Sequence, residues 1–119
     1  MSASPESTNN GPAFQSIIAG YSEPYSFGAT SGYSQVFEED TTIVCLFATE
    51  DCWVRMVTES DNTTVAQAGS SGAKGLSSFI PGGITAFLGV PIRRDVRYKL
   101  AVVRATSVSG ILHITEGGV

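Results

Sequence analysis

From residue 34 onward, short runs of β-branched and aromatic residues alternate with turn signals, and this alternation constrains the fold more than any other feature. A signal of Gly, Pro, Asn, Asp or Ser recurs about every ten residues, and no segment repeats apolar residues at the 3.6-residue period of an amphipathic helix. About seven or eight short strands at this spacing are typical of an all-β sandwich or barrel. The runs predicted as strands are Ser34–Glu38, Thr42–Ala48, Cys52–Glu59, Thr63–Gln67, Leu76–Ile80, Ile84–Val90, Val96–Thr106 and Ile111–Thr115.

The composition of these runs and of the residues between them predicts some local geometry. Thr42–Ala48 is nearly all apolar, so we expect this strand to be buried on both faces. The short polar loop at Glu50–Asp51 predicts a hairpin to the next strand. Pro81–Gly82 predicts a type II turn, because proline presets φ at the second turn position and glycine accepts a positive φ at the third. Pro91 confines the strand before it to a sheet edge or ends it.

Residues 1–33 differ in composition from the rest of the chain. They are rich in Ser, Gly, Pro and Asn, yet they hold five of the eleven aromatic residues. Rings separated by Gly and Ser suit an extended segment that inserts them into pockets. We therefore expect an extended N-terminal arm over residues 1–33 and a β-sandwich domain over residues 34–119. The arm either wraps its own domain or orders on a neighbouring subunit, and disorder is the third alternative. Its rings are Phe14, Tyr21, Tyr25, Phe27 and Tyr33.

Charge is unevenly distributed along a chain whose net charge is −4. Residues 1–54 contain seven acidic residues and no Lys or Arg, whereas residues 55–119 contain seven basic and four acidic residues. Such a separation can orient a partner, including a second copy of the chain, unless folding mixes the two halves.

One basic stretch is the strongest polar feature of the second half. It suits contact with an acidic protein surface or, equally, a solvated strand edge that resists aggregation. Because the whole chain is acidic and Tyr98 is the one aromatic residue nearby, we expect no binding to nucleic acid. The stretch contains Arg93, Arg94, Arg97, Lys99 and Arg104.

No constellation of catalytic residues is evident in the sequence. His113 is the single histidine and is expected to be an ordinary strand residue. Cys45 and Cys52 flank the predicted hairpin out of register, so we expect two buried free thiols, and no serine lies in a G-x-S-x-G elbow. The acidic residues at 38–40 and 50–51 suit solvated loops or, alternatively, a cation site. We expect no enzyme activity, no cofactor and no metal.

The C-terminal part of the chain carries two motifs. An I-P-G-G turn lies at Ile80–Gly83, and the sequence S-G-I-L-H-I-T-E-G-G follows a strand at Ser109–Gly118. This part resembles a recurrent type of small protein encoded near the capsid gene of tailed phages. The resemblance covers roughly a third of the chain and rests mostly on turn chemistry. It implies a structural virion protein of the head, often a decoration or cement protein with an antiparallel β-sandwich or jelly-roll fold.

The resemblance implies binding across neighbouring major capsid subunits and self-association as a dimer or trimer. The resemblance also implies synthesis in the host cytoplasm and residence on the capsid surface. We expect no membrane association, because no apolar run reaches the length of about 20 residues that a membrane helix needs. The alternatives are a head fibre base, a head–tail joining protein, and a carbohydrate-binding β-sandwich module. The last needs an exposed aromatic platform, whereas Trp53 is expected in the core. Residues predicted to contact partners are Phe14, Tyr21, Tyr25, Phe27, Tyr33, Arg93, Arg94 and Arg97.

Overall fold

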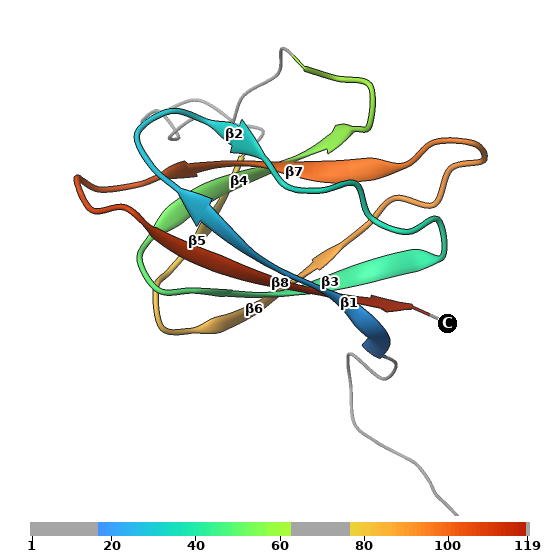
Figure 1. Ribbon diagram of the computed structural model, residues 1–119, viewed down its shortest axis with the longest axis horizontal. Helices are drawn as coiled ribbons and strands as arrows, with labels where there is room; N and C mark the ends of the chain where they lie inside the picture. The colour runs from blue at the N-terminus through green and yellow to red at the C-terminus, as the bar shows by residue number, and fades with distance from the viewer. Residues whose placement is uncertain (1–16, 63–76, 119) are drawn as a thin grey trace, which may run out of the picture.

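The structure is a computed structural model that describes residues 17–62 and 77–118. Within these ranges the chain forms eight strands and no helix (Figure 1). The predicted strand Thr63–Gln67 and the ring of Phe14 lie outside the described residues. The strands are β1 (Ile17–Phe27), β2 (Gly32–Tyr33), β3 (Thr41–Ala48), β4 (Cys52–Thr58), β5 (Ser78–Ile80), β6 (Thr85–Gly89), β7 (Tyr98–Arg104) and β8 (Gly110–Gly118).

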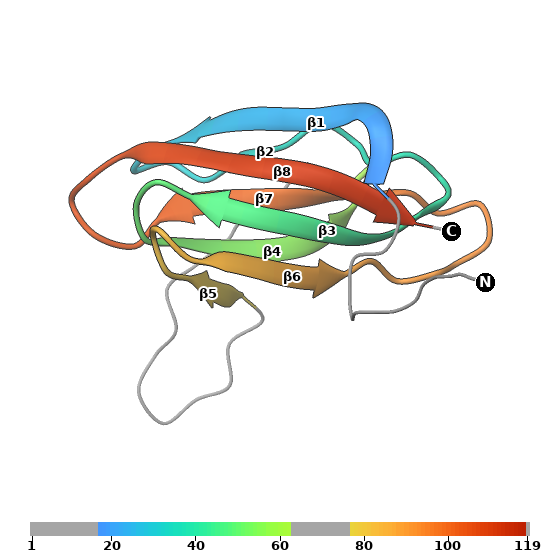
Figure 2. The same cartoon turned by 90° about the horizontal axis from the view of Figure 1, so that it is seen from below.

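These strands form two antiparallel sheets that pack face to face, which confirms the predicted β-sandwich. The first sheet has the order β1-β8-β3-β6 and the second has the order β2-β7-β4-β5. Figure 1 shows the sheets as two layers, and Figure 2 looks onto the first sheet, in which its four strands lie side by side. β6 is an edge strand, as Pro91 predicts.

The pairing of the strands is nested. β1 pairs with β8, β2 with β7, β3 with β6, and β4 with β5. This is the pattern of one long antiparallel ribbon that turns between β4 and β5 and is rolled so that successive pairs fall in alternate sheets. Every connection except that between β4 and β5 therefore crosses from one sheet to the other. An eight-stranded sandwich of this kind is a jelly roll.

The predicted hairpin at Glu50–Asp51 is wrong, because β3 and β4 lie in different sheets. Ala48, at the end of β3, and Cys52, at the start of β4, are both fully buried in the core that the sheets share. Turn residues allow the chain to reverse, but they do not decide whether the next strand lies beside the previous one or opposite it. Here burial of both flanking side chains favours the opposite position.

The core lies between the two sheets, and the side chains of each strand alternate between this core and the outside. Val44 and Leu46 of β3 are fully buried, whereas Phe47 between Leu46 and Ala48 is 40% exposed. The prediction that this strand is buried on both faces is therefore wrong. An antiparallel sandwich covers one face of each sheet and leaves the other face to solvent. The largest fully buried side chains are Phe37, Leu46, Leu100, Leu112 and Ile114.

Residues 17–33 belong to the sandwich, although the composition of residues 1–33 predicted an extended arm. β1 pairs with β8 from Ser22 to Phe27, and β2 pairs with β7. Pro24 is compatible with this strand because β1 lies at a sheet edge. Tyr25 and Phe27 alternate toward the core over too short a distance for the pattern to be evident in the sequence.

The turn after β5 is shifted by one residue from its prediction. Gly83, not Gly82, has a positive φ of 80°. Gly82 is required for a different reason, since a Cβ atom there would come within 2.9 Å of the backbone of Glu50. Its N–H donates a hydrogen bond to the carboxylate of Asp51 at 2.8 Å. The glycine pair thus fastens this crossing connection to the one that follows β3.

Both cysteines are free thiols, as predicted. Cys52 is fully buried, whereas Cys45 is half-buried, so the expectation of two buried thiols holds for one of them. Burial, with a smaller contribution from the charge of Asp51, raises the pKa of the Cys52 thiol to about 12, from an ordinary value of 9.0.

This shift in the pKa of Cys52 predicts a loss of stability at alkaline pH. Between pH 9 and about 12 the unfolded chain releases the Cys52 proton while the folded chain retains it, so unfolding becomes more favourable as the pH rises. Denaturant unfolding of the native chain and of the Cys52→Ala variant, each referred to its own stability at neutral pH, measures the effect. We expect a shallower alkaline decline in the variant. Equal declines would contradict the assignment.

Candidate functional site

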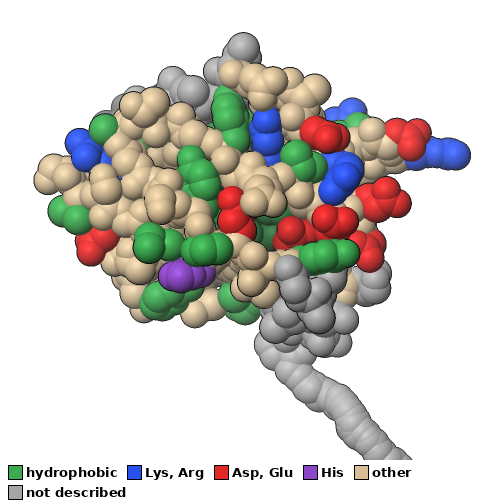
Figure 3. Space-filling view, in the orientation of Figure 1, with side chains coloured by type: hydrophobic (Ala, Val, Ile, Leu, Met, Phe, Trp, Pro, Cys, Tyr) green, Lys and Arg blue, Asp and Glu red, His purple; other side chains and the backbone are tan. Residues whose placement is uncertain are grey.

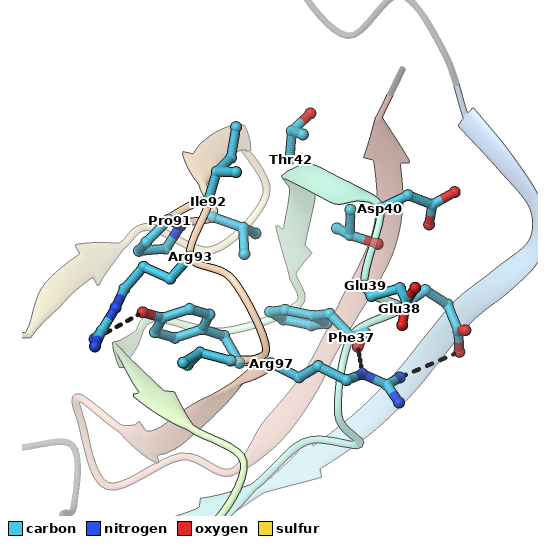
Figure 4. A pocket seen from close by; sticks show the side chains of 13 residues that line it. Phe37, Glu38, Glu39, Asp40, Thr42, Pro91, Ile92, Arg93 and Arg97 are labelled. Carbon is cyan, nitrogen blue, oxygen red and sulfur yellow. Dashed lines mark hydrogen bonds and ion pairs between the residues drawn. The ribbon is translucent and has the colours of Figure 1, made fainter.

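One end of the sandwich is formed by residues 37–42, which lead into β3, and by residues 90–97, which connect β6 to β7. We call it the charged end. The two segments face each other across a cavity of about 220 Å³ (Figure 4). Buried or half-buried apolar side chains line its floor, and charged side chains line its rim. The floor contains Phe37, Val90, Val96 and Tyr98, and the rim contains Glu38, Glu39, Asp40, Arg93 and Arg97.

Hydrogen bonds and an ion pair hold the first segment in place. The carboxylate of Glu116 accepts hydrogen bonds from the backbone N–H of Glu38 at 2.9 Å and from the hydroxyl of Thr41 at 2.6 Å. The Nε of Arg97 donates to the carbonyl of Phe37 at 2.9 Å, and its guanidinium lies 3.7 Å from the Glu38 carboxylate (Figure 4). The segment is therefore tied to β8 of the first sheet and to the residue before β7 of the second. Residues 34–38, predicted as a strand, instead form an irregular connection that backbone hydrogen bonds from Ser34 and Phe37 hold against β7.

Folding brings the acidic and the basic stretches of the sequence together at the charged end. Figure 3 shows acidic and basic side chains side by side there. The charge separation along the sequence is thus locally mixed in space. Among the predicted contact residues, Arg93 and Arg94 are exposed, whereas Arg97 is half-buried and engaged with Glu38.

The predicted aromatic contact residues do not share one surface. Tyr21 is 38% exposed, Tyr25 packs against the core, and Phe27 is a core residue that is 4% exposed. Phe27 therefore cannot present its ring to a partner while the sandwich is intact, which corrects that prediction. The ring of Tyr33 lies on the outside of the second sheet, with the ammonium nitrogen of Lys99 4.4 Å from its centroid.

Sequence reasoning missed an apolar surface on the outside of the first sheet. Phe47 is 40% exposed, Phe87 is 50% exposed and Ile111 is 37% exposed. His113 lies opposite Phe47 in the β3–β8 register, and their ring centroids are 6.5 Å apart. Figure 3 shows the histidine among hydrophobic side chains. We call these four residues the apolar face. No sequence signal indicates it, because Ala86, Phe87 and Leu88 of β6 are all apolar although their exposure alternates in the structure.

A second aromatic pair lies on the outside of the second sheet. Trp53 and Phe79 are opposite each other in the β4–β5 register, and their rings make an edge-on contact with centroids 5.3 Å apart. Trp53 is half-buried in a small cluster with Val57 and Ala101, outside the main core. The prediction that Trp53 is a core residue is therefore corrected.

The acidic residues do not converge on one cation site in the described part of the chain. Residues 38–40 precede β3 and residues 50–51 follow it, so the full length of an eight-residue strand separates them. No group of three or more His, Cys, Asp or Glu side chains in residues 17–62 and 77–118 is placed to hold a metal ion. No helix within those residues is long and apolar enough to span a membrane.

The fold and these surfaces define a jelly-roll β-sandwich with one charged end and an exposed apolar face on its first sheet. Comparison of the chain with protein-family models, with curated proteins and with solved structures found no match.

The two hydrogen bonds accepted by the Glu116 carboxylate predict an effect on stability. Glu116→Ala removes the acceptor of two hydrogen bonds and leaves their donors unpaired, so we expect a loss of about 2 kcal/mol in the free energy of unfolding. Glu116→Gln keeps a carbonyl acceptor and should lose less. The matched control is Glu50→Ala, at an exposed acidic position, with an expected change below about 0.5 kcal/mol. Urea unfolding measures both variants. Equal losses in the free energy of unfolding for Glu116→Ala and Glu50→Ala would contradict a stabilising role for these hydrogen bonds.

Proposed function

We propose that this protein is a structural component of a tailed-phage head, a decoration or cement protein that binds across neighbouring major capsid subunits. Made in the host cytoplasm, it acts on the outer surface of the shell without catalysing a reaction. The observation that carries the proposal is the apolar face, where Phe47, Phe87 and Ile111 are 40%, 50% and 37% exposed on one side of a sheet. Grouped apolar side chains on a rigid sheet mark a surface for protein contact.

The resemblance of the C-terminal part supports this role. Residues 80–83 include the end of β5 and most of its connection to β6. Residues 109–118 contain β8, which contributes Ile111 and His113 to the apolar face. The jelly roll is used by viral capsid proteins and by lectins, so the fold is compatible with the proposal by analogy.

The energetics suit a repetitive partner. Phe47 and Phe87 are each about half exposed, so complete burial of each ring contributes about 1 kcal/mol. A single contact of this size is weak. A closed shell presents the same site many times, and self-association of the decorating protein turns several weak contacts into one stable attachment.

A carbohydrate-binding module is the second candidate, and the Trp53–Phe79 pair favours it. Phe79 is 45% exposed and lies edge-on to Trp53, so the two rings offer a small aromatic platform on the second sheet. Binding to a glycan array that is lost in the Phe79→Ser variant would establish this function instead.

The copy number of the protein in purified virions tests the proposal. A decoration protein should be present in roughly hundreds of copies per particle, because the number of capsid subunits sets the number of binding sites. Quantitative mass spectrometry against the major capsid protein measures this ratio. About six or twelve copies would indicate a ring or fibre base at one vertex. Absence from the purified particle would refute the proposal.

A paired substitution tests the apolar face. We expect Phe47→Ser combined with Phe87→Ser to lower occupancy on particles stripped of the protein by at least about tenfold. The reason is that both rings that would be buried against the shell are then removed. Phe79→Ser is the matched control, since it removes a ring of similar exposure from the opposite sheet and should leave occupancy unchanged. Circular dichroism checks that each variant is folded. Equal occupancy of both variants would contradict the assignment of this face.

A further inference from the structure

Ile92 is the most exposed large hydrophobic side chain in the described part of the chain, with an exposed fraction of 83%. It lies in the connection between β6 and β7, and Arg93 and Arg94, both exposed, follow it directly. Figure 4 shows Ile92 on the wall of the cavity at the charged end. The side chain borders this cavity without being buried in it.

The cavity beside Ile92 has a definite chemical preference. Phe37, Val90 and Tyr98 line it and are each buried, so its floor accepts an aliphatic group. Glu39 and Asp40 on its rim are exposed and form no ion pair with any described residue. On the side of the rim formed by Glu39 and Asp40, the ligand that fits is therefore an aliphatic side chain followed by one or two cationic side chains.

The chain itself presents a segment of this chemistry, in the order Ile92, Arg93, Arg94. Arg94 forms no ion pair with the described residues, and Arg93 makes one long hydrogen bond, 3.4 Å, to the hydroxyl of Tyr98. Within one molecule the segment forms a wall of the cavity. A second copy of the chain can supply the same segment from the opposite side.

We infer that two copies of this chain associate through their charged ends about a two-fold axis. Ile92 of each copy inserts into the cavity of the other, and Arg93 and Arg94 of each face Glu39 and Asp40 of the other. Two-fold symmetry forms every such contact twice. This arrangement suits the charged end, because each copy carries both the acidic cavity rim and the segment from Ile92 to Arg94 that fits it. Burial of Ile92 supplies affinity, while the opposed charges set orientation and register. The inference does not depend on attachment to a capsid, because the apolar face lies on the first sheet and not at the charged end.

Sedimentation of the full chain over a range of concentrations tests this dimer. We expect a monomer–dimer equilibrium that weakens when the salt concentration rises from about 50 mM to about 1 M, since the screening length falls to about 3 Å. Ile92→Ser should raise the dissociation constant at least about tenfold, and it should still fold because the side chain is exposed. A chain that stays monomeric at every concentration would overturn the inference, as would a dimer that Ile92→Ser leaves unchanged.

Charge reversal on the two segments gives a sharper test of the geometry. The Arg93→Glu/Arg94→Glu variant places acidic side chains on both segments, and the Glu39→Lys/Asp40→Lys variant places basic side chains on both. Each variant alone should be monomeric because like charges oppose across the two-fold axis. An equimolar mixture should form a heterodimer, since each variant then offers what the other needs.

A control separates this geometry from attraction between net charges. Glu50→Lys combined with Ser107→Lys and Ser109→Lys raises the net charge by the same amount as Glu39→Lys/Asp40→Lys, but at the opposite end of the sandwich. With Arg93→Glu/Arg94→Glu this control should associate much more weakly than the intended pair, because only one of the two reciprocal contacts is complementary. In the other contact, Glu39 and Asp40 of the control face the acidic side chains introduced at positions 93 and 94. Equal heterodimer formation with both basic variants would overturn the inference, as would failure of the intended pair to associate.

Discussion

One shared core between two rolled sheets is the constraint on which the rest of the structure depends. Since β1 pairs with β8, β2 with β7, β3 with β6 and β4 with β5, successive pairs fall in opposite sheets. Each crossing connection must bring the chain over the edge of the core. The connections are therefore gathered at the two ends of the sandwich, and one of these ends is the charged end.

The same constraint produces the outer faces. Small and medium aliphatic side chains such as Val44 and Leu46 fill the narrow space between the sheets, and the alternate positions of the same strands point away from it. On the first sheet these positions hold Phe47, Phe87, Ile111 and His113, which leaves an apolar surface where an antiparallel sheet commonly exposes polar side chains. The rigid core thus supports two separate surfaces, the charged end, for which we infer self-association, and the apolar face, for which we propose contact with another protein.

Turn chemistry and β-branched runs were sufficient to predict an all-β sandwich and the positions of β3, β4, β6 and β7 within a few residues. The pairing of strands was not predictable in the same way, because residues 49–51 are equally suited to a hairpin and to a crossing between sheets. β1 was missed since Tyr25 and Phe27 give too short an alternation, and Pro24 weakens it further. At the charged end the sequence indicated the basic stretch, but the cavity arises from packing of two segments that are distant in the sequence, with Phe37 and Val90 separated by 53 positions. The apolar face could not be predicted, because a strand of mostly apolar residues has the same sequence pattern whether one of its faces is buried or both are.

Adhesion through the apolar face is the central claim, and hydroxyl-radical footprinting of the protein on and off the shell measures it most directly. Radical labelling reports the solvent exposure of individual rings. Phe47 and Phe87 should lose several-fold in reactivity when the protein is bound to a capsid, while Phe79 on the opposite sheet keeps the reactivity that it has in the free protein. Unchanged labelling of Phe47 and Phe87 on protein that is demonstrably attached to the particle would contradict the account.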